Sequence, residues 1–243
     1  MEAWGLTDPG NVRQQNQDAY QIVKLGEKAL LCVVCDGMGG AKSGNVASKL
    51  ASEVFCEEMK RSFKPQMTPH EAEVALRAAV TLSNISVYEH SQLSEEYSGM
   101  GTTLVAALLY EKGTIVVNVG DSRAYHIDPD GVECITVDHS LVELMVQRGE
   151  LTPEQAKSHP SKNLITRAVG TMPQVYPDVF HVKTEKEDCI LLCTDGLSNE
   201  MADQEILFEV IHGVHKDDCC QRLLQIAKER GAPDNVTSIL IAL

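Results

Sequence analysis

Several apolar stretches of this sequence end on a single aspartate, and this repeated pattern constrains the fold more than any other feature. The stretch CVVCDGMGG leads from four apolar residues into Asp36 and then into glycines. The pattern returns in VVNVGDSR at Asp121, in LLCTDGLS at Asp195 and, just before an apolar run, in APDNVTSIL at Asp234. A carboxylate at the end of a buried strand is costly unless it is paired or binds a cation. The chain must therefore fold so that these carboxylates find partners.

Two interpretations of these aspartates are open. Each one alone suits a turn, because Asp-Gly pairs are common in turns. Together they favour a cluster of oxygen ligands, which Mg²⁺ and Mn²⁺ prefer. The glycines after Asp36 would also let a backbone carbonyl approach a metal closely. The sequence contains no HExxH motif, so a zinc hydrolase is not predicted.

Short apolar runs rich in β-formers are separated by longer segments of helical periodicity. Many runs are apolar at consecutive positions, which is typical of strands covered on both faces. We predict strands at 29–35, 102–110, 114–119, 123–127, 189–194 and 236–243, with hairpin turns at 111–113 and 120–122. Apolar stripes predict helices around 46–55, 72–85 (with Leu82 and Ile85 in the stripe), 203–213 and 220–231. This order favours two sheets packed face to face, with helices outside.

Residues 140–176 break this pattern. We expect two short helices there, the second with Thr152 as its N-cap and Pro153 in its first turn. We interpret the segment as an insertion between core strands.

Length, charge and cysteine content narrow the class of protein. The chain has 243 residues, and we expect a single domain over 1–243. A net charge of −14 argues against nucleic acid or anionic lipid as a main partner. We find no apolar run of about 18 residues and no secretion leader, so we expect no membrane span and a cytoplasmic location. The eight cysteines are expected to be reduced structural thiols.

Carboxylates that hold two cations would suit the binding of a phosphoryl group and the activation of water. The remaining phosphate charge favours an arginine, which can bind two phosphate oxygens at once. Arg13 in RQQNQD is the candidate, with Asp18 five residues further on, although a solvated loop is the alternative interpretation. Cysteine-nucleophile and aspartyl-phosphate chemistry are not predicted, because the sequence has no C-x5-R motif and Asp36 does not begin a D-x-D motif.

Taken together, these segments resemble the metal-dependent protein serine/threonine phosphatases, the PPM or type-2C family in its bacterial form. RQQNQD resembles the R-x-x-N-x-D signature, and DGMGG followed by SGNVAS resembles the D-G-M-G-G motif. Further motifs match in family order: MGTTL, VGDSRAY, DHSLV, HPSKNLITRAVG, CTDGLSNEM and DNVTSILI. The resemblance implies an α+β fold of four layers, α-β-β-α, with a central antiparallel β-sandwich flanked by helices. It also implies that 140–176 is a flap near the substrate groove.

The same resemblance implies a set of metal ligands. Asp36 would bridge two Mn²⁺ or Mg²⁺ ions. The Gly37 carbonyl would serve the first ion, and Asp195 and Asp234 would serve the second. Asp121 would hold a third, weaker ion.

The resemblance further implies that Arg13 holds the substrate phosphate and that Asp18 hydrogen-bonds metal-bound water. The implied reaction is hydrolysis of phosphoserine and phosphothreonine in proteins by a water or hydroxide that bridges the two ions. In signal transduction this reaction would oppose a Ser/Thr kinase. Met38 stands where human-type members carry a histidine often assigned as general acid, so the acid is left open, with a metal-bound water near Asp121 as the candidate.

A non-catalytic, phosphatase-like module that binds or senses phosphoproteins is the alternative function. The expected carboxylates are all present, which favours the enzyme. Three histidines could be taken for catalytic bases, but we expect them to be loop or rim residues: His139, His159 and His181.

Overall fold

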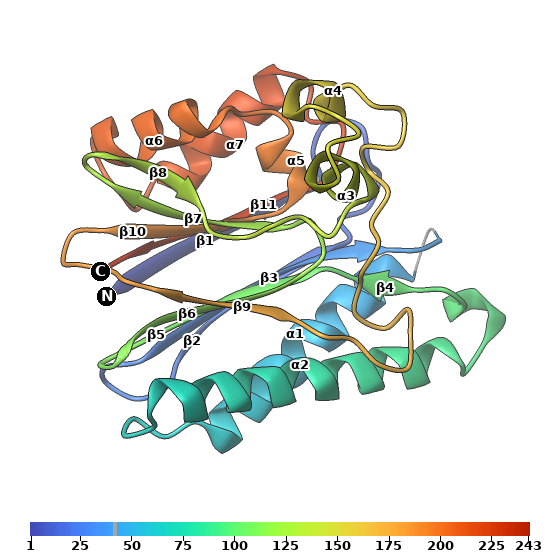
Figure 1. Ribbon diagram of the computed structural model, residues 1–243, viewed down its shortest axis with the longest axis horizontal. Coiled ribbons are helices and arrows are strands. Elements are labelled where there is room, and N and C mark those ends of the chain that lie inside the picture. The colour runs from blue at the N-terminus through green and yellow to red at the C-terminus, as the bar shows by residue number, and fades with distance from the viewer. Residues whose placement is uncertain (41–42) are drawn as a thin grey trace.

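The computed structural model describes residues 1–40 and 43–243, and two antiparallel sheets form its centre (Figure 1). The first sheet has the order β1-β11-β10-β7-β8, with β1 (Glu2–Asp8), β11 (Val236–Ala242), β10 (Cys189–Cys193), β7 (Arg123–Asp128) and β8 (Gly131–Cys134). The second has the order β2-β3-β5-β6-β9, with β2 (Asp18–Lys24), β3 (Leu30–Met38), β5 (Leu104–Tyr110), β6 (Gly113–Val119) and β9 (Asp178–Val182). The short β4 (Gly101–Thr102) pairs with the end of β3.

Helices cover the outer face of each sheet, which confirms the predicted four-layer α-β-β-α arrangement (Figure 1). The second sheet is covered by α1 (Gly44–Ser62) and α2 (Pro69–Ser91), which is followed by a 3-10 turn, η1 (Glu95–Tyr97). The first sheet is covered by α5 (Asp195–Ser198), α6 (Asp203–His212) and α7 (Cys219–Glu229). One apolar cluster fills each helix–sheet layer, and a third fills the space between the two sheets.

The predicted strand 102–110 and the predicted hairpin at 120–122 need correction. The predicted strand 102–110 forms two strands, β4 and β5, because the strand is interrupted at Thr103. The turn at 120–122 joins no hairpin, since it carries the chain from β6 in one sheet to β7 in the other. Gly120 permits this crossing with a φ of +111°, and a Cβ there would lie 2.5 Å from Thr103 Cγ2.

The apolar stripe predicted on α2 is also partly wrong. Leu82 and Ile85 are 38% and 39% exposed. The helix instead buries a face that includes Leu76, Val80 and Val87, because this face is the one that meets the second sheet.

The segment between β8 and β9 contains α3 (Leu141–Gln147) and α4 (Pro153–Lys157), beside one end of the strands (Figure 1). The N-cap prediction is confirmed: Thr152 Oγ1 accepts a hydrogen bond from Gln155 N at 3.3 Å, and Gln155 Oε1 accepts one from Thr152 N at 2.8 Å. The isolated bridge Thr102–Val169 ties the segment to β4, and a second bridge, Ser140–Ile165, joins two parts of the segment itself. All eight cysteines are free and seven are buried. In residues 1–40 and 43–243, every helix is too short or too polar to cross a bilayer.

Candidate functional site

The strand ends place the predicted carboxylates at one end of the sandwich. Asp18 opens β2 and is the register partner of Asp36 near the end of β3. Asp195 directly opens α5 after β10, and Asp234 comes two residues before β11, the strand that pairs with β10. Asp121 lies in the turn that connects the two sheets. Residues far apart in the chain therefore meet where their strands begin or end.

These carboxylates lie close enough together for the negative charge of one to raise the pKa of another. Burial raises the pKa of Asp36 well above its usual range, and the charges of Asp18 and Asp195 raise it further. Burial and the charge of Asp234 raise the pKa of Asp195. Burial and the charge of Asp195 raise the pKa of Asp121 to about 8. The structure thus brings all five together in one carboxylate cluster: Asp18, Asp36, Asp121, Asp195 and Asp234.

Two threonines from the first sheet hold Asp18. Its Oδ2 accepts hydrogen bonds from Thr237 Oγ1 at 2.6 Å and from Thr194 Oγ1 at 3.0 Å. Thr7 Oγ1 lies 2.7 Å from Thr237 Oγ1 and in turn accepts from Asn16 Nδ2 at 2.8 Å. Burial still raises the pKa of Asp18 to about 7, because these two hydrogen bonds only partly offset the loss of solvent.

Thr103 links Asp36 to the turn that carries Asp121. Asp36 N donates to Thr103 Oγ1 at 2.8 Å, and Thr103 N donates to Asp36 O at 2.9 Å. Thr103 Oγ1 also lies 2.7 Å from Ser122 Oγ, next to Asp121. Thr103, the residue between β4 and β5, therefore connects Asp36 with the turn that carries Asp121.

Arg13 forms a two-point contact with Asp234. Its Nε donates to Oδ1 at 2.9 Å and its Nη2 donates to Oδ2 at 2.8 Å, and both side chains remain partly exposed. This hydrogen bond, followed by the charges of Asp234, Asp36 and Asp195, raises the pKa of Arg13. Arg13, the residue predicted to bind the substrate phosphate, thus lies at the edge of the carboxylate cluster.

Asn235 positions the loop that carries Arg13. Its Nδ2 donates to Pro9 O and to Gln15 O, each at 3.0 Å, and its Oδ1 accepts from Gln17 N at 2.8 Å. The side chain is buried, with 4% exposure. Two segments more than 200 residues apart are held together by this one amide.

Two glycines allow close backbone approach at the site. A Cβ on Gly37 would lie 2.1 Å from Gly44 O, and one on Gly196 would lie 2.0 Å from Asn235 O. Gly37 N donates to Gln17 O at 3.1 Å. Close packing therefore requires a glycine at both positions, whatever further role the Gly37 carbonyl has.

The oxygens of the carboxylate cluster suit hard divalent cations. The Oδ1 atoms of Asp18, Asp121 and Asp195 are buried and have no hydrogen-bond partner among the described residues. Such oxygens are costly to bury, and an oxygen-coordinated cation would offset that cost. As the side chains stand, the described part of the chain holds no closed set of three or more Asp, Glu, His or Cys ligands. A cation bound by Asp234 would compete with the Arg13 guanidinium for these oxygens.

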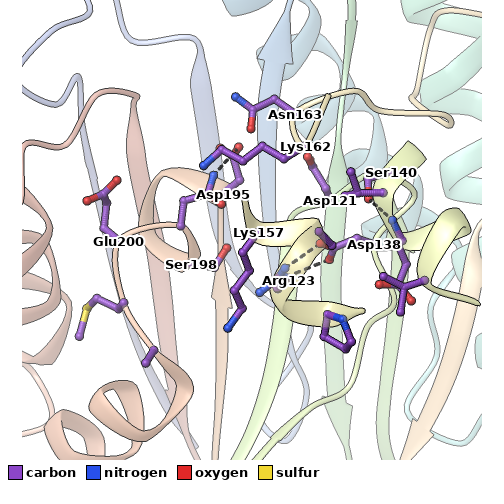
Figure 2. A pocket seen from close by; sticks show the side chains of 18 residues that line it. Asp121, Arg123, Asp138, Ser140, Lys157, Lys162, Asn163, Asp195, Ser198 and Glu200 are labelled. Atoms are coloured by element: carbon purple, nitrogen blue, oxygen red, sulfur yellow. Dashed lines mark hydrogen bonds and ion pairs between the residues drawn. The ribbon is translucent and has the colours of Figure 1, made fainter. Parts of the chain in front are cut away.

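A cavity of about 560 Å³ adjoins the cluster (Figure 2). Asp121 and Asp195 form part of its wall, and Lys157 and Lys162 of the insertion line the same space. Arg123, which also lines the cavity, donates to both carboxylate oxygens of Asp138, at 2.9 and 2.7 Å. The cavity thus brings cationic side chains of the insertion to a site whose core is acidic.

The three histidines lie outside the carboxylate cluster. His139 is buried; its Nδ1 accepts from Gly120 N at 3.0 Å and its Nε2 lies 3.2 Å from Asp178 Oδ2. His159 Nδ1 accepts from Ser161 N within the insertion, and His181 pairs with Glu73 across β9 and α2. His139 nevertheless supports the site indirectly, because Gly120 precedes Asp121.

Four supporting residues were not predicted as part of the site: Thr103, Thr194, Asn235 and Thr237. All four stand inside the quoted motifs; Thr194, Asn235 and Thr237 are also close to an aspartate in the sequence, whereas Thr103 is not. Their place in these motifs is the signal that could have drawn attention to them, although it does not reveal their distant partners.

Known proteins resemble this chain along nearly its whole length. Residues 11–240 match the family model described as Protein phosphatase 2C. The chain is 33% identical over 242 residues to the Serine/threonine phosphatase stp of Listeria innocua, which covers 99% of this chain and 95% of that protein. It is 32% identical over 244 residues to Protein phosphatase PhpP of Streptococcus pneumoniae serotype 2, covering 100% and 98%. The solved S. agalactiae serine/threonine phosphatase superposes with a TM-score of 0.93 at 33% identity, covering 100% and 99%.

Proposed function

The chain belongs to the protein phosphatase 2C family and is a protein serine/threonine phosphatase, and we propose that it works by direct attack of water at a site of two divalent cations. In this proposal Asp36, the Gly37 carbonyl, Asp195 and Asp234 would hold two Mn²⁺ or Mg²⁺ ions. Asp121 would hold a third, weaker ion.

One observation carries this proposal. Five carboxylates from separate strand ends lie together, and three of them have a buried oxygen without a partner among the described residues. Clustered negative charge of this kind destabilises a fold unless it serves a ligand of opposite sign. The donors are all oxygens, the ligand type of Mg²⁺ and Mn²⁺.

Bound cations would supply Lewis-acid charge to the phosphoryl group and make a water nucleophilic near neutral pH. The chain's own residues then orient the reaction. Arg13 exchanges its two-point contact with Asp234 for a two-point contact with phosphate, which has the same oxygen geometry. Asp18 is held on one oxygen by Thr237 and Thr194, which leaves its Oδ1 free to accept a hydrogen bond from the attacking water.

In this proposal a solvent water donates the proton to the leaving oxygen. Met38 has no proton to donate, and the three histidines lie outside the carboxylate cluster. The cavity of about 560 Å³ keeps the Asp121 side of the site open to water.

We place the substrate polypeptide in this cavity. The insertion forms one wall and supplies Lys157 and Lys162, whereas α5 and the residues after it form the other. These lysines could pair with acidic side chains of a substrate, but Glu143 and Glu200 line the same cavity, so the lining sets no overall preference for acidic substrates. The insertion would thereby act as the predicted flap.

The partners and location follow from the chemistry. A phosphoserine or phosphothreonine substrate must come from a protein Ser/Thr kinase, so we propose such a kinase as the opposing enzyme. Eight free cysteines suit the reducing cytoplasm. The acidic charge argues against nucleic acid as a partner.

Mn²⁺-dependent hydrolysis of p-nitrophenyl phosphate and of a phosphothreonine peptide tests the proposal. We expect both activities to require added Mn²⁺ or Mg²⁺ and to fall by at least about 100-fold in Asp36→Asn. Asp130→Asn, on the exposed turn after β7, is the matched control and should behave as the parent protein. Equal turnover in excess chelator would contradict the mechanism. Binding of the phosphopeptide without turnover would favour the non-catalytic module instead.

A further inference from the structure

A second cavity, of about 540 Å³, lies beside the carboxylate cluster and shares no lining residue with the first. It opens between the loop that joins β1 to β2, the first turn of α1 and the 3-10 turn η1. Six described residues line it: Gln15, Asn16, Asn45, Val46, Glu96 and Tyr97.

Short contacts connect this second cavity to the carboxylate cluster. Asn16 Oδ1 accepts a hydrogen bond from Asp18 N at 3.1 Å. Asn45 directly follows Gly44, whose carbonyl oxygen packs so closely on Gly37 that a Cβ would not fit there. The second cavity therefore begins roughly 10 Å from the cluster, which about three residues of extended chain can span.

The 3-10 turn η1 lies beside the same part of the site. Met100 N donates to Tyr97 O at 3.1 Å, and a Cβ on Gly39 would lie 3.4 Å from Met100 Cα. Gly39 follows Asp36 by three residues, so the turn after Asp36 packs against the chain that leaves η1. The carboxylate cluster thus has the first cavity on its Asp121 side and the second on its Asp36 side.

The lining of the second cavity combines apolar surface with one unpaired carboxylate. Val46 and Tyr97 are half-buried and pack on the apolar cluster between the helices and the second sheet. Glu96 is exposed, and its side chain forms no hydrogen bond or ion pair within residues 1–40 and 43–243. The six lining residues include no lysine, arginine or histidine. Lysine and arginine side chains match this lining, because an apolar stem carries a cation at its end.

We propose that the second cavity binds a basic side chain of the substrate polypeptide, within about three residues of the phosphorylated residue. Glu96 would be its ion-pair partner, and Val46 and Tyr97 would pack on its stem. This binding mode rests on the proposed phosphatase function, since the phosphorylated residue must lie at the carboxylate cluster. The substrate would extend to both sides of the cluster, with its other flank in the first cavity. The net charge of −14 would help to attract a basic substrate.

Phosphothreonine peptides that differ at a single position test the proposal. Each peptide carries Arg, Ala or Glu at one of the three positions on either side of the phosphothreonine, and kcat/KM is measured with the full chain and Mn²⁺. On one side we expect Arg to raise kcat/KM about two- to fivefold over Ala and Glu to lower it, as one exposed ion pair allows. The advantage of Arg should shrink in about 0.5 M NaCl, because salt screens such a pair.

Glu96→Gln should abolish this preference, and Glu96→Lys should reverse it in favour of the Glu peptide. The position is exposed, so neither substitution should prevent folding. Glu95→Gln is the matched control, because Glu95 is exposed in the same 3-10 turn but does not line the cavity. Hydrolysis of p-nitrophenyl phosphate should be equal in all variants, since this substrate has no flanking residues to reach the second cavity.

Equal kcat/KM for the Arg and Glu peptides in the parent protein would overturn the proposal, and so would a preference that Glu96→Lys leaves unchanged. A preference lost equally in Glu95→Gln would also overturn it, because the cause would then be the charge of η1 as a whole. Turnover of p-nitrophenyl phosphate separates this proposal from the mechanism. If the parent protein does not hydrolyse it with Mn²⁺, the proposed mechanism fails. If it does so without distinguishing the peptides, only the role of the second cavity fails.

Discussion

Asp18 and Asp36 stand directly opposite each other on the neighbouring antiparallel strands β2 and β3. Like charges in this position destabilise a sheet. Thr237 and Thr194 stabilise one oxygen of Asp18, but the other oxygen has no partner among the described residues. The phosphatase site therefore lowers the stability of the fold when no cation is bound.

Replacing Asp18 with asparagine should stabilise the protein in chelator. The folded Asp18 carboxyl has a pKa of about 7, whereas its ordinary value is 3.8. The stabilisation from proton uptake is therefore present in acid and is lost as the pH rises from about 4 to about 7. We expect Asp18→Asn to raise the free energy of unfolding by about 1–3 kcal/mol at pH 7.5 in EDTA, measured by urea denaturation. The same variant should lose activity.

The stability of the parent protein in EDTA should also fall between pH 5 and pH 8, and less steeply in Asp18→Asn. Asp121 adds to this slope, because burial raises its pKa to about 8. Saturating Mn²⁺ should reduce or reverse the slope, since cations bind the deprotonated carboxylates. A stability in EDTA that rises over this pH range would contradict the carboxylate cluster as described.

Loss of the Arg13 side chain should weaken catalysis but strengthen Mn²⁺ binding. We expect Arg13→Ala to lower kcat/KM by about 10- to 100-fold, because a charge-assisted, two-point phosphate contact is lost. The Mn²⁺ concentration for half-maximal activity should fall, because Asp234 no longer pairs with a guanidinium. The kcat/KM of Arg13→Lys should lie between those of the parent protein and Arg13→Ala, since an ammonium keeps the charge but cannot make the two-point contact. A Mn²⁺ requirement that rises in Arg13→Ala would show that the ion pair does not compete with metal. Arg61→Ala, in an exposed pair with Glu58 on α1, is the control.

Inner strands could be predicted from the sequence, whereas edge strands could not. The predicted strands correspond to β3, β5, β6, β7, β10 and β11, which all have a neighbour on each side. Those missed are β1, β8, β2 and β9, which are the four edges of the two sheets. An edge strand is partly exposed, so its sequence need not form a continuous apolar run. EAWGLTD in β1 and DAYQIVK in β2 mix polar and apolar residues for this reason.

Four carboxylates of the site could be predicted because each one borders an apolar run, whereas Asp18 was expected only from the resemblance of RQQNQD to the family signature. Their supporting residues could not, because the contacts join distant parts of the chain. Thr237 and Asp18 are 219 residues apart, and Asn235 and Pro9 are 226 apart. A threonine or asparagine beside a strand carries no sign of such a partner. The path of the turn at Gly120 likewise depends on Thr103, which comes from another strand.

Loss of the Asn235 side chain should affect stability and catalysis together. Asn235→Ala removes three hydrogen bonds from a buried position, so we expect a loss of about 2–4 kcal/mol in the free energy of unfolding. The Arg13 loop would no longer be held, and kcat/KM should fall as well. Asn235→Asp keeps the acceptor for Gln17 N but turns a buried carboxylate oxygen toward Pro9 O and Gln15 O, so it should be no more stable than Asn235→Ala. Asn11→Ala, which removes one exposed hydrogen bond to Lys228 O, should cost less than about 1 kcal/mol. Equal losses for Asn11→Ala and Asn235→Ala would contradict this role.

His139 should act on metal binding through the backbone of the turn that carries Asp121. Its ring Nδ1 accepts from Gly120 N at 3.0 Å, and the backbone N–H of His139 donates to Gly120 O at 2.9 Å. Burial lowers the pKa of His139, so the ring is neutral at pH 7 and its Nε2–H can donate to Asp178. We expect His139→Asn to lower stability by about 1–3 kcal/mol and to raise the Mn²⁺ concentration for half-maximal activity severalfold. Mn²⁺ titration by calorimetry, alongside urea denaturation, separates these two effects. His159→Asn, in the insertion, should change neither quantity appreciably. A stability loss in His139→Asn with unchanged Mn²⁺ binding would restrict His139 to the fold and would leave the position of Asp121 independent of it.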